Sequence, residues 1–173
     1  TLPANCALTV GANIRYVKVQ TFNQYTFAPV SVVLASDLVA KHFKAEGKDQ
    51  PFDAYKAGDK LIPWKIVAEF KGADLLGLRY HQLMPYVQNE NLDKNALRVI
   101  AGDFVTTEDG TGVVHTASVF GTDDFRVCRE NKVPSVMVTD EQGNEVPIVN
   151  KQGKFVDQIT DFAGRFVKEE YYS

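Results

Sequence analysis

Residues that bind metals or act as nucleophiles are scarce in this sequence and lie far apart. The two cysteines, Cys6 and Cys128, form no C-x-x-C pair and have no histidine at metal-binding spacing. The three histidines, His42, His81 and His115, are isolated from one another, so neither a local zinc site nor an H-E-x-x-H helix can form. No G-x-S-x-G segment occurs to support a serine nucleophile. We therefore predict no metal site and two reduced, mostly buried thiols.

Long hydrophobic runs and an excess of either charge are also missing. Charged residues interrupt every stretch that approaches the roughly 20 apolar residues of a membrane helix. The first residues lack the basic start and apolar stretch of a signal peptide. The net charge is −3 and the pI near 5.6, so charge alone does not predict nucleic-acid binding. With 173 residues, 45% of them hydrophobic, the sequence predicts one soluble, cytoplasmic globular domain over 1–173, without a membrane partner.

Both ends of the sequence lead us to expect a fragment of a longer protein. The first residue is Thr1 rather than Met. Near the other end, Phe166, Val167, Tyr171 and Tyr172 have the apolar spacing of a helix that is cut short. We therefore expect that these residues were excised from a larger chain.

Short runs of β-forming residues separated by turn residues make up most of the chain. The run 14–22 changes its apolar face part-way, which predicts a β-bulge, and residues 11–13 predict a hairpin-like break before it. Helices are predicted to begin at Ser36 and to run from Gly121 to about Asn131. Strands are expected at 7–10, 14–22, 30–34, 64–71, 97–105, 112–117, 135–139 and 145–149. This pattern predicts a mainly β fold, a β-barrel with a few short helical insertions, with an α+β sandwich as the alternative.

Residues 106–125, TTEDGTGVVHTASVFGTDDF, carry the side chains best suited to chemistry. Gly110 and Gly112 allow backbone N–H groups to face a ligand without an intervening Cβ. Asp124 is expected in the first turn of a helix, where the helix dipole favours a carboxylate that suits an ammonium group. Acidic residues there commonly only stabilise the helix, and a lone strand histidine such as His115 is commonly only packed. From the residues alone, both interpretations stay open.

Two separated motifs resemble one known family. The segment GTGVVHTASVFGTDDF at 110–125 and the opening TLPAN at 1–5 are similar to the editing domain of isoleucyl-tRNA synthetases, the insertion called connective polypeptide 1. The resemblance extends over the whole chain and includes GADLLGLRY at 72–80. The His-Thr-Ala at 115–117 favours the isoleucyl member over the related valyl and leucyl editing domains. The resemblance therefore implies a β-barrel editing domain.

The resemblance implies a proofreading hydrolase. One missing methylene is worth only about 1–3 kcal/mol in binding, isoleucyl-tRNA synthetase itself being the usual illustration, so a second pocket is needed for fidelity. That pocket hydrolyses valine from mischarged tRNA(Ile) and, secondarily, valyl-adenylate. The implied partners are the valine-carrying 3′ end of tRNA(Ile) and the remainder of the synthetase chain, in a monomeric enzyme. No cofactor is expected in this domain, because ATP and magnesium serve the parent synthetase elsewhere.

The resemblance also implies roles for individual residues. Asp124 is expected to bind the α-ammonium of the substrate. His115 is expected to form a wall of the side-chain pocket that excludes isoleucine. No nucleophile or strong base is assigned, since an aminoacyl ester beside a ribose hydroxyl is already labile and needs mainly a placed water and oxyanion donors. The substrate-binding residues implied around them are Thr1, Asn5, Gly110, Thr111, Gly112 and Phe120.

The sequence departs from the family pattern at two places. Ser118 stands where the family usually has proline, which frees φ and adds an N–H in the loop before Asp124. The threonines that precede TLPAN in the family lie outside this chain, so we expect the isolated chain to hydrolyse its substrate weakly.

Two alternatives remain open at this stage. One is a noncatalytic barrel that binds the tRNA end or an amino acid, favoured by the missing threonines and the lack of a strong base. The other is an editing domain of the valyl or leucyl type.

Overall fold

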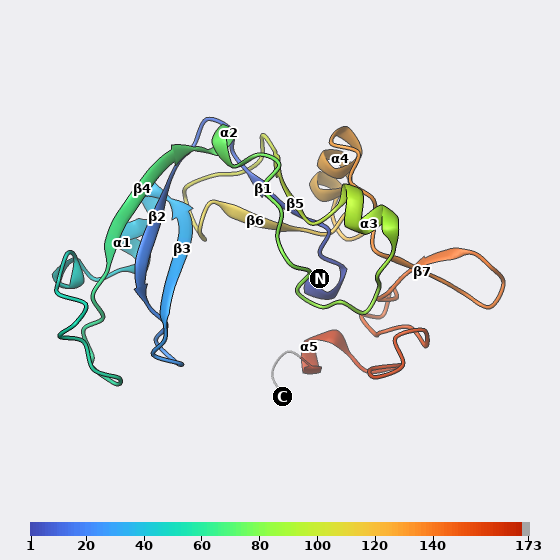
Figure 1. Ribbon diagram of the computed structural model, residues 1–173. Helices are drawn as coiled ribbons and strands as arrows, with labels where there is room; N and C mark the ends of the chain where they lie inside the picture. Colours follow the sequence, from blue (N-terminus) through green and yellow to red (C-terminus); the bar gives the residue numbers. More distant parts are fainter. Residues whose placement is uncertain (171–173) are drawn as a thin grey trace. The chain divides into compact units, whose positions relative to one another are not determined.

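The computed structural model describes residues 1–170, so Tyr171 and Tyr172 of the expected last helix lie outside the described residues (Figure 1). The chain divides into two compact units. The first unit comprises Thr1–Thr9, Gly77–Ile100 and His115–Ser173, and the second comprises Val10–Leu76 and Ala101–Val114. The prediction of a single domain over 1–173 stays a prediction.

The second unit is built on an antiparallel sheet of three strands in the order β3-β2-β4 (Figure 1). Its strands are β2 (Arg15–Phe22), β3 (Pro29–Ala35) and β4 (Lys65–Lys71). Exposed and half-buried side chains alternate along β4, as its alternating sequence predicts. The register of β2 against β4 shifts between Lys18 and Val19, which confirms the predicted bulge.

A hydrophobic core forms on one face of this sheet. Trp64 is buried in it and is held in place by an indole N–H that donates to the Lys44 carbonyl over 2.7 Å. The buried members of the cluster are Val17, Val19, Leu34, Val39 and Trp64. The short helices of this unit are η2 (Ser36–Leu38), α1 (Val39–His42), η3 (Ala45–Gly47) and α2 (Gly72–Leu75). The predicted helix start at Ser36 is confirmed.

A second sheet has the strand order β5-β1-β6, and most of its residues belong to the first unit. Its strands are β1 (Ala7–Val10), β5 (Arg98–Ala101) and β6 (Val113–Thr116). The hairpin expected at residues 11–13 is wrong, because β1 and β2 belong to different sheets. Strand β1 instead lies between two strands that come about 90 and 105 residues later in the chain, a pairing that no local turn signal predicts.

The remaining elements of the first unit are short. They are η1 (Leu2–Ala4), α3 (Glu90–Asn95), α4 (Thr122–Glu130), β7 (Met137–Thr139), β8 (Glu145–Pro147) and α5 (Val167–Glu170). Helix α4 ends with Asn131 as its C-cap, as predicted. Strands β7 and β8 lie within the strands expected at 135–139 and 145–149, and they pair antiparallel.

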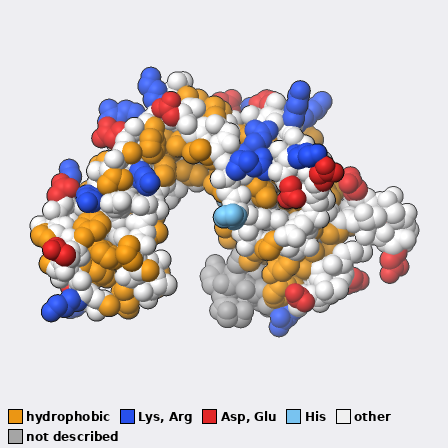
Figure 2. Space-filling model, in the orientation of Figure 1, with side chains coloured by type: hydrophobic (Ala, Val, Ile, Leu, Met, Phe, Trp, Pro, Cys, Tyr) orange, Lys and Arg blue, Asp and Glu red, His pale blue; other side chains and the backbone are white. Residues whose placement is uncertain are grey.

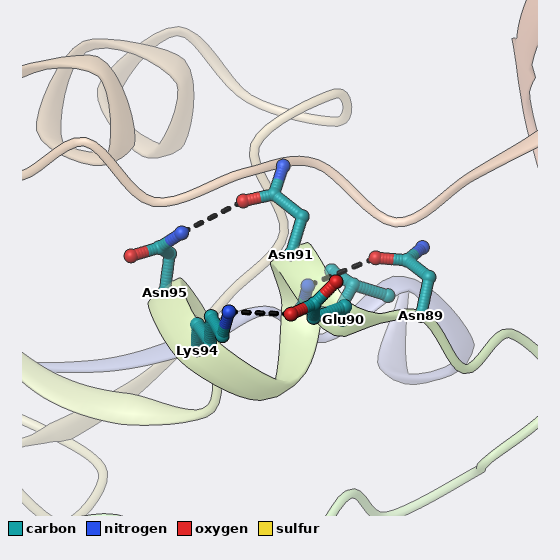
Figure 3. Close-up of polar contacts among 6 residues, drawn as sticks. Asn89, Glu90, Asn91, Lys94 and Asn95 are labelled. Carbon is teal, nitrogen blue, oxygen red and sulfur yellow. Dashed lines mark hydrogen bonds and ion pairs between the residues drawn. The ribbon is translucent and has the colours of Figure 1, made fainter.

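Helix α3 shows how local side-chain bonds stabilise a helix of only six residues (Figure 3). Asn89 caps it by accepting a hydrogen bond from the Leu92 N–H over 2.9 Å. Glu90 pairs with Lys94 one turn later, and the Asn95 amide donates to the Asn91 side chain over 2.8 Å. These exposed contacts are local to α3.

The described strands form three separate sheets of three, three and two strands, with few helices. None of these sheets closes on itself within residues 1–170, so the closed barrel stays a prediction. No helix in that part of the chain is long and apolar enough to cross a membrane. Lys and Arg side chains are mixed with Asp and Glu over the face drawn in Figure 2, in keeping with the scattered basic residues of the sequence.

Replacing Gly112 by alanine is expected to destabilise the second unit more than the same change at Gly110. Both glycines have positive φ, +76° and +68°, where a Cβ costs roughly 1–2 kcal/mol. At Gly112 the new Cβ would also lie 2.7 Å from the Ala35 Cβ, whereas Gly110 has open space. Overpacking adds about 1–3 kcal/mol. Urea unfolding of both variants measures the difference, and equal losses would contradict the steric argument.

Candidate functional site

The two motifs that suggested a site meet in the first unit through one hydrogen bond. Asn5, the last residue of TLPAN, is only 2% exposed and lies just before β1. Its side-chain nitrogen Nδ2 lies 2.7 Å from Nδ1 of His115 on β6. The same Nδ2 donates to the Ala7 carbonyl over 3.0 Å, and the Tyr80 hydroxyl donates to Oδ1. Asn5 is therefore a buried support for His115, and its role as a substrate contact stays a prediction.

His115 is held as a neutral ring. Burial and, after it, the positive Thr1 ammonium lower its pKa from the ordinary 6.5. The negative charge of Asp124 and a hydrogen-bonding interaction with the Thr1 backbone oppose this shift without reversing it. Its second ring nitrogen, Nε2, is buried, and no residue in the described range 1–170 meets it in hydrogen-bond geometry. A neutral, half-buried imidazole suits a pocket wall.

Asp124 occupies the first turn of α4, where the sequence placed it. It is half-buried, and its Oδ2 accepts a hydrogen bond from the Ala117 N–H over 2.8 Å. The neighbouring carboxylate, Asp123, is the one that pairs with Arg126, at 3.6 Å. The free N–H groups of the helix start and its dipole favour a negative charge at this position. Asp124 thus holds the loop after His115, and its carboxylate acts electrostatically on the Thr1 ammonium.

The first unit also contains a cleft of about 850 Å³. Thr1 and Phe120, both implied as substrate contacts, line it, and Phe120 is 37% exposed. Other lining residues include Val119, Val146, Val149, Lys151, Phe155 and Asp157. His115 and Asp124 are not lining residues of this cleft. Its volume lies within the roughly 300–1,000 Å³ of small-molecule sites.

Gly110, Thr111 and Gly112 lie in the second unit and make structural contacts there. The Thr111 carbonyl accepts from the Ala35 N–H over 2.8 Å, and the Gly110 carbonyl lies 2.7 Å from His42 Nε2. The Gly112 carbonyl accepts from the Tyr16 hydroxyl over 2.6 Å. These contacts explain the positive-φ turn, and the role of the three residues as a pocket floor stays a prediction.

Several contacts around the site had no signal in the sequence. The Tyr80 hydroxyl donates a hydrogen bond to Asn5. Tyr86 packs edge-on against Phe155 and Phe162. A turn pattern or motif cannot reveal such partners, because they come from distant parts of the chain.

Ser118 and the two cysteines are also buried in this unit. Ser118 stands at the place of the family proline, and its hydroxyl donates to the Ser135 hydroxyl over 2.7 Å. This bond restrains the loop before Asp124, in which the absence of proline leaves φ unrestricted. Cys6 and Cys128 are both buried free thiols, as predicted, with their sulfur atoms 3.7 Å apart. Among the described residues, no group of three or more His, Cys, Asp or Glu side chains could hold a metal ion.

Comparison with known proteins identifies the relatives of this chain. No family model matches it. It is 57% identical over 171 residues to the isoleucine–tRNA ligase of Cytophaga hutchinsonii, covering 99% of this chain. It is 45% identical over 187 residues to that of Bacteroides fragilis and 36% identical over 179 residues to the cytoplasmic enzyme of Arabidopsis thaliana. Its homologues are isoleucine–tRNA ligases. The resemblance seen in the motifs is therefore confirmed.

The match to isoleucine–tRNA ligases concerns a small part of those enzymes. The chain spans about 15% of the length of the curated relatives it matches. Its fold is similar to that of GlLeuRS-CP1, a leucyl-tRNA synthetase CP1 domain of known crystal structure, with a TM-score of 0.57 at 13% identity. The alignment covers 97% of this chain and 69% of the other, and at this identity it shows the fold alone. The chain thus matches a small part of isoleucine–tRNA ligases and has a fold similar to that of a CP1 domain.

Lowering the pH below 6.5 is expected to destabilise this chain through His115. Because the pKa of folded His115 lies below 6.5, the unfolded ring binds a proton at a higher pH than the folded ring. The free energy of unfolding therefore falls as the pH drops through 6.5, and this loss of stability is complete once the pH lies below the folded pKa. Urea unfolding of the chain and of His115→Gln across this range measures it. The difference between the two should shrink on acidification, and parallel curves would refute the assignment.

Proposed function

We propose that this chain is the part of an isoleucine–tRNA ligase that removes wrongly attached valine from tRNA(Ile). The observation that carries the proposal is the 2.7 Å bond between Asn5 and His115, since it joins the two motifs of the editing family across 110 residues. Asp124 lies nine residues after His115, and its charge acts on that ring. All three residues belong to the first unit.

The proposed site works by positioning rather than by a strong acid or base. Asp124 binds the α-ammonium of the valyl group through a charge-assisted contact at the start of α4. The neutral His115 ring closes the side-chain pocket, so that valine enters and isoleucine, with its extra methylene, does not. Water then attacks the ester, which the neighbouring ribose hydroxyl makes labile.

The cleft lined by Thr1 and Phe120 is the proposed place for the rest of the substrate. Its lining is mainly apolar and includes two aromatic residues, Phe120 and Phe155, which suits the base and ribose of a tRNA 3′ end. Valyl-adenylate would present the same adenosine. The remaining partner is the rest of the synthetase chain, which would make most of the contacts with the tRNA and would carry out the chemistry that uses ATP and magnesium. The whole enzyme would be monomeric and cytoplasmic.

Removing the charge of Asp124 is expected to slow deacylation of valyl-tRNA(Ile) by the full-length synthetase. In Asp124→Asn the amide oxygen can still accept from the Ala117 N–H, so the loop stays in place while the cation site is lost. Hydrogen bonds to charged groups are worth about 1.5–3 kcal/mol, which corresponds to roughly a 10- to 100-fold lower rate.

The matched control for Asp124 is its neighbour. Asp123→Asn removes an exposed carboxylate in the same helical turn, one that pairs only weakly with Arg126, and it should keep the parent rate. Release of radiolabelled valine from mischarged tRNA measures both. Equal rates for Asp124→Asn and the parent would remove Asp124 from the site.

Removing the His115 ring is expected to change which amino acid is accepted. With the wall gone in His115→Ala, the pocket should admit the extra methylene, and correctly charged isoleucyl-tRNA(Ile) should become a substrate. Because the loss of one methylene contact changes discrimination by about 10- to 200-fold, the ratio of valyl to isoleucyl deacylation should fall by that order. If isoleucyl-tRNA(Ile) remained fully protected, the wall role would be wrong.

A further inference from the structure

The amide group of Asn5 has only one orientation that satisfies its partners. Nδ2 lies 3.0 Å from the Ala7 carbonyl, an acceptor with no proton to give, so the atom there must be the NH2 group. The Tyr80 hydroxyl meets Oδ1, which fits the same orientation. With 2% exposure, Asn5 has little opportunity to exchange these partners for water.

This orientation also determines where the proton of His115 lies. Because Nδ2 of Asn5 is a donor, the His115 Nδ1 that lies 2.7 Å from it must accept through its lone pair. A neutral imidazole carries its single proton on the other nitrogen, and the lowered pKa keeps this ring neutral. The proton therefore lies on Nε2.

Among residues 1–170, no acceptor meets that proton in hydrogen-bond geometry. Nε2 is buried, and a buried polar atom without such a partner costs free energy and is rare. A hydrogen-bonding interaction with the Thr1 backbone raises the pKa of the ring, and Thr1 itself is exposed and lines the 850 Å³ cleft. A ligand that displaces Thr1 from the ring would therefore meet this donor.

We propose that the Nε2–H of His115 donates a hydrogen bond to the carbonyl oxygen of the aminoacyl ester, and that Asn5 is the positioning residue that fixes this tautomer. The inference rests on the proposed function and adds a donor to it. In an aminoacyl ester the α-ammonium and the carbonyl oxygen are carried by adjacent carbon atoms. A residue near Asp124 whose donor is unpartnered is therefore well placed to meet that oxygen when Asp124 binds the ammonium.

The donor acts without giving up its proton. Water adds to the carbonyl carbon and loses a proton, and the carbonyl oxygen gains negative charge that the Nε2–H stabilises. When the intermediate collapses, the bond to the ribose oxygen breaks, that oxygen takes up a proton, and valine leaves as the free acid. His115 is in the same state before and after, so no general base on this residue is needed.

The test changes the donor on Asn5 into an acceptor. Asn5→Asp is nearly isosteric, but a carboxylate can only accept, so Nδ1 of His115 must carry the proton. At a pH above the pKa of the ring, Nε2 then has no proton to donate. Nitrogen-15 NMR of the histidine-labelled chain reports which nitrogen is protonated. We expect Nε2–H in the parent chain and Nδ1–H in Asn5→Asp.

The same variants in the full-length synthetase connect the tautomer to function. We expect Asn5→Asp to lower deacylation of valyl-tRNA(Ile) roughly 10- to 100-fold, the loss typical of one oxyanion donor being of this order or larger. Isoleucyl-tRNA(Ile) should stay protected, because the ring still forms the wall. Asn95→Asp is the matched control, since it makes the same change on the exposed face of α3 and should alter neither tautomer nor rate (Figure 3).

Each outcome has a distinct meaning. Nδ1–H in the parent chain would overturn the inference whatever the activity. An active parent synthetase whose rate is unchanged in Asn5→Asp, despite an inverted tautomer, would overturn this inference alone. A parent that leaves valyl-tRNA(Ile) intact would overturn the proposed function and this inference with it. If Asn5→Asp fails to fold, Asn5→Ala replaces it, and the inference then requires a mixture of tautomers with a partial loss of rate.

Discussion

The hydrogen bond between Asn5 and His115 is the contact on which the proposed site depends. It joins residues 110 positions apart, and it uses a buried amide whose other atoms are already bonded to Ala7 and Tyr80. A buried polar group without partners is costly, so each of these bonds constrains the others. The result is a histidine ring that has one orientation and one protonation state before any substrate arrives.

The sheet β5-β1-β6 explains why this bond can form. Strand β1 begins two residues after Asn5, and the Cys6 N–H between them donates to the carbonyl of Thr116, the residue after His115, over 3.0 Å. The hydroxyl of the same Thr116 lies 2.6 Å from the hydroxyl of Thr9 on β1. The Leu97 N–H donates to the Cys6 carbonyl on the other side. Because a slip of one residue would turn side chains to the opposite face, this register keeps Asn5 and His115 together.

The local elements of this fold could be predicted from the sequence, whereas its pairings could not. Alternation along β4, the bulge in β2 and the start and end of α4 are encoded by neighbouring residues, and the structure agrees with all of them. The insertion of β1 between β5 and β6 depends on contacts across most of the chain, so the expected hairpin after β1 was wrong. The motif identified His115 and Asp124, but nothing in it pointed to Tyr80.

The electrostatics of the site favour a mechanism in which hydrolysis depends on the positioning of the substrate and water rather than on a general base. A general base needs a free lone pair, yet in His115 the Nδ1 lone pair accepts from Asn5 and Nε2 carries the proton. Oδ2 of Asp124 accepts a hydrogen bond from the Ala117 N–H. This bond fixes the direction of the carboxylate, which is suited to bind a cation. An ester that is labile by its own chemistry needs no stronger group. A fixed cation site, a fixed donor and a ring that excludes one methylene are then sufficient to select the wrong amino acid and release it.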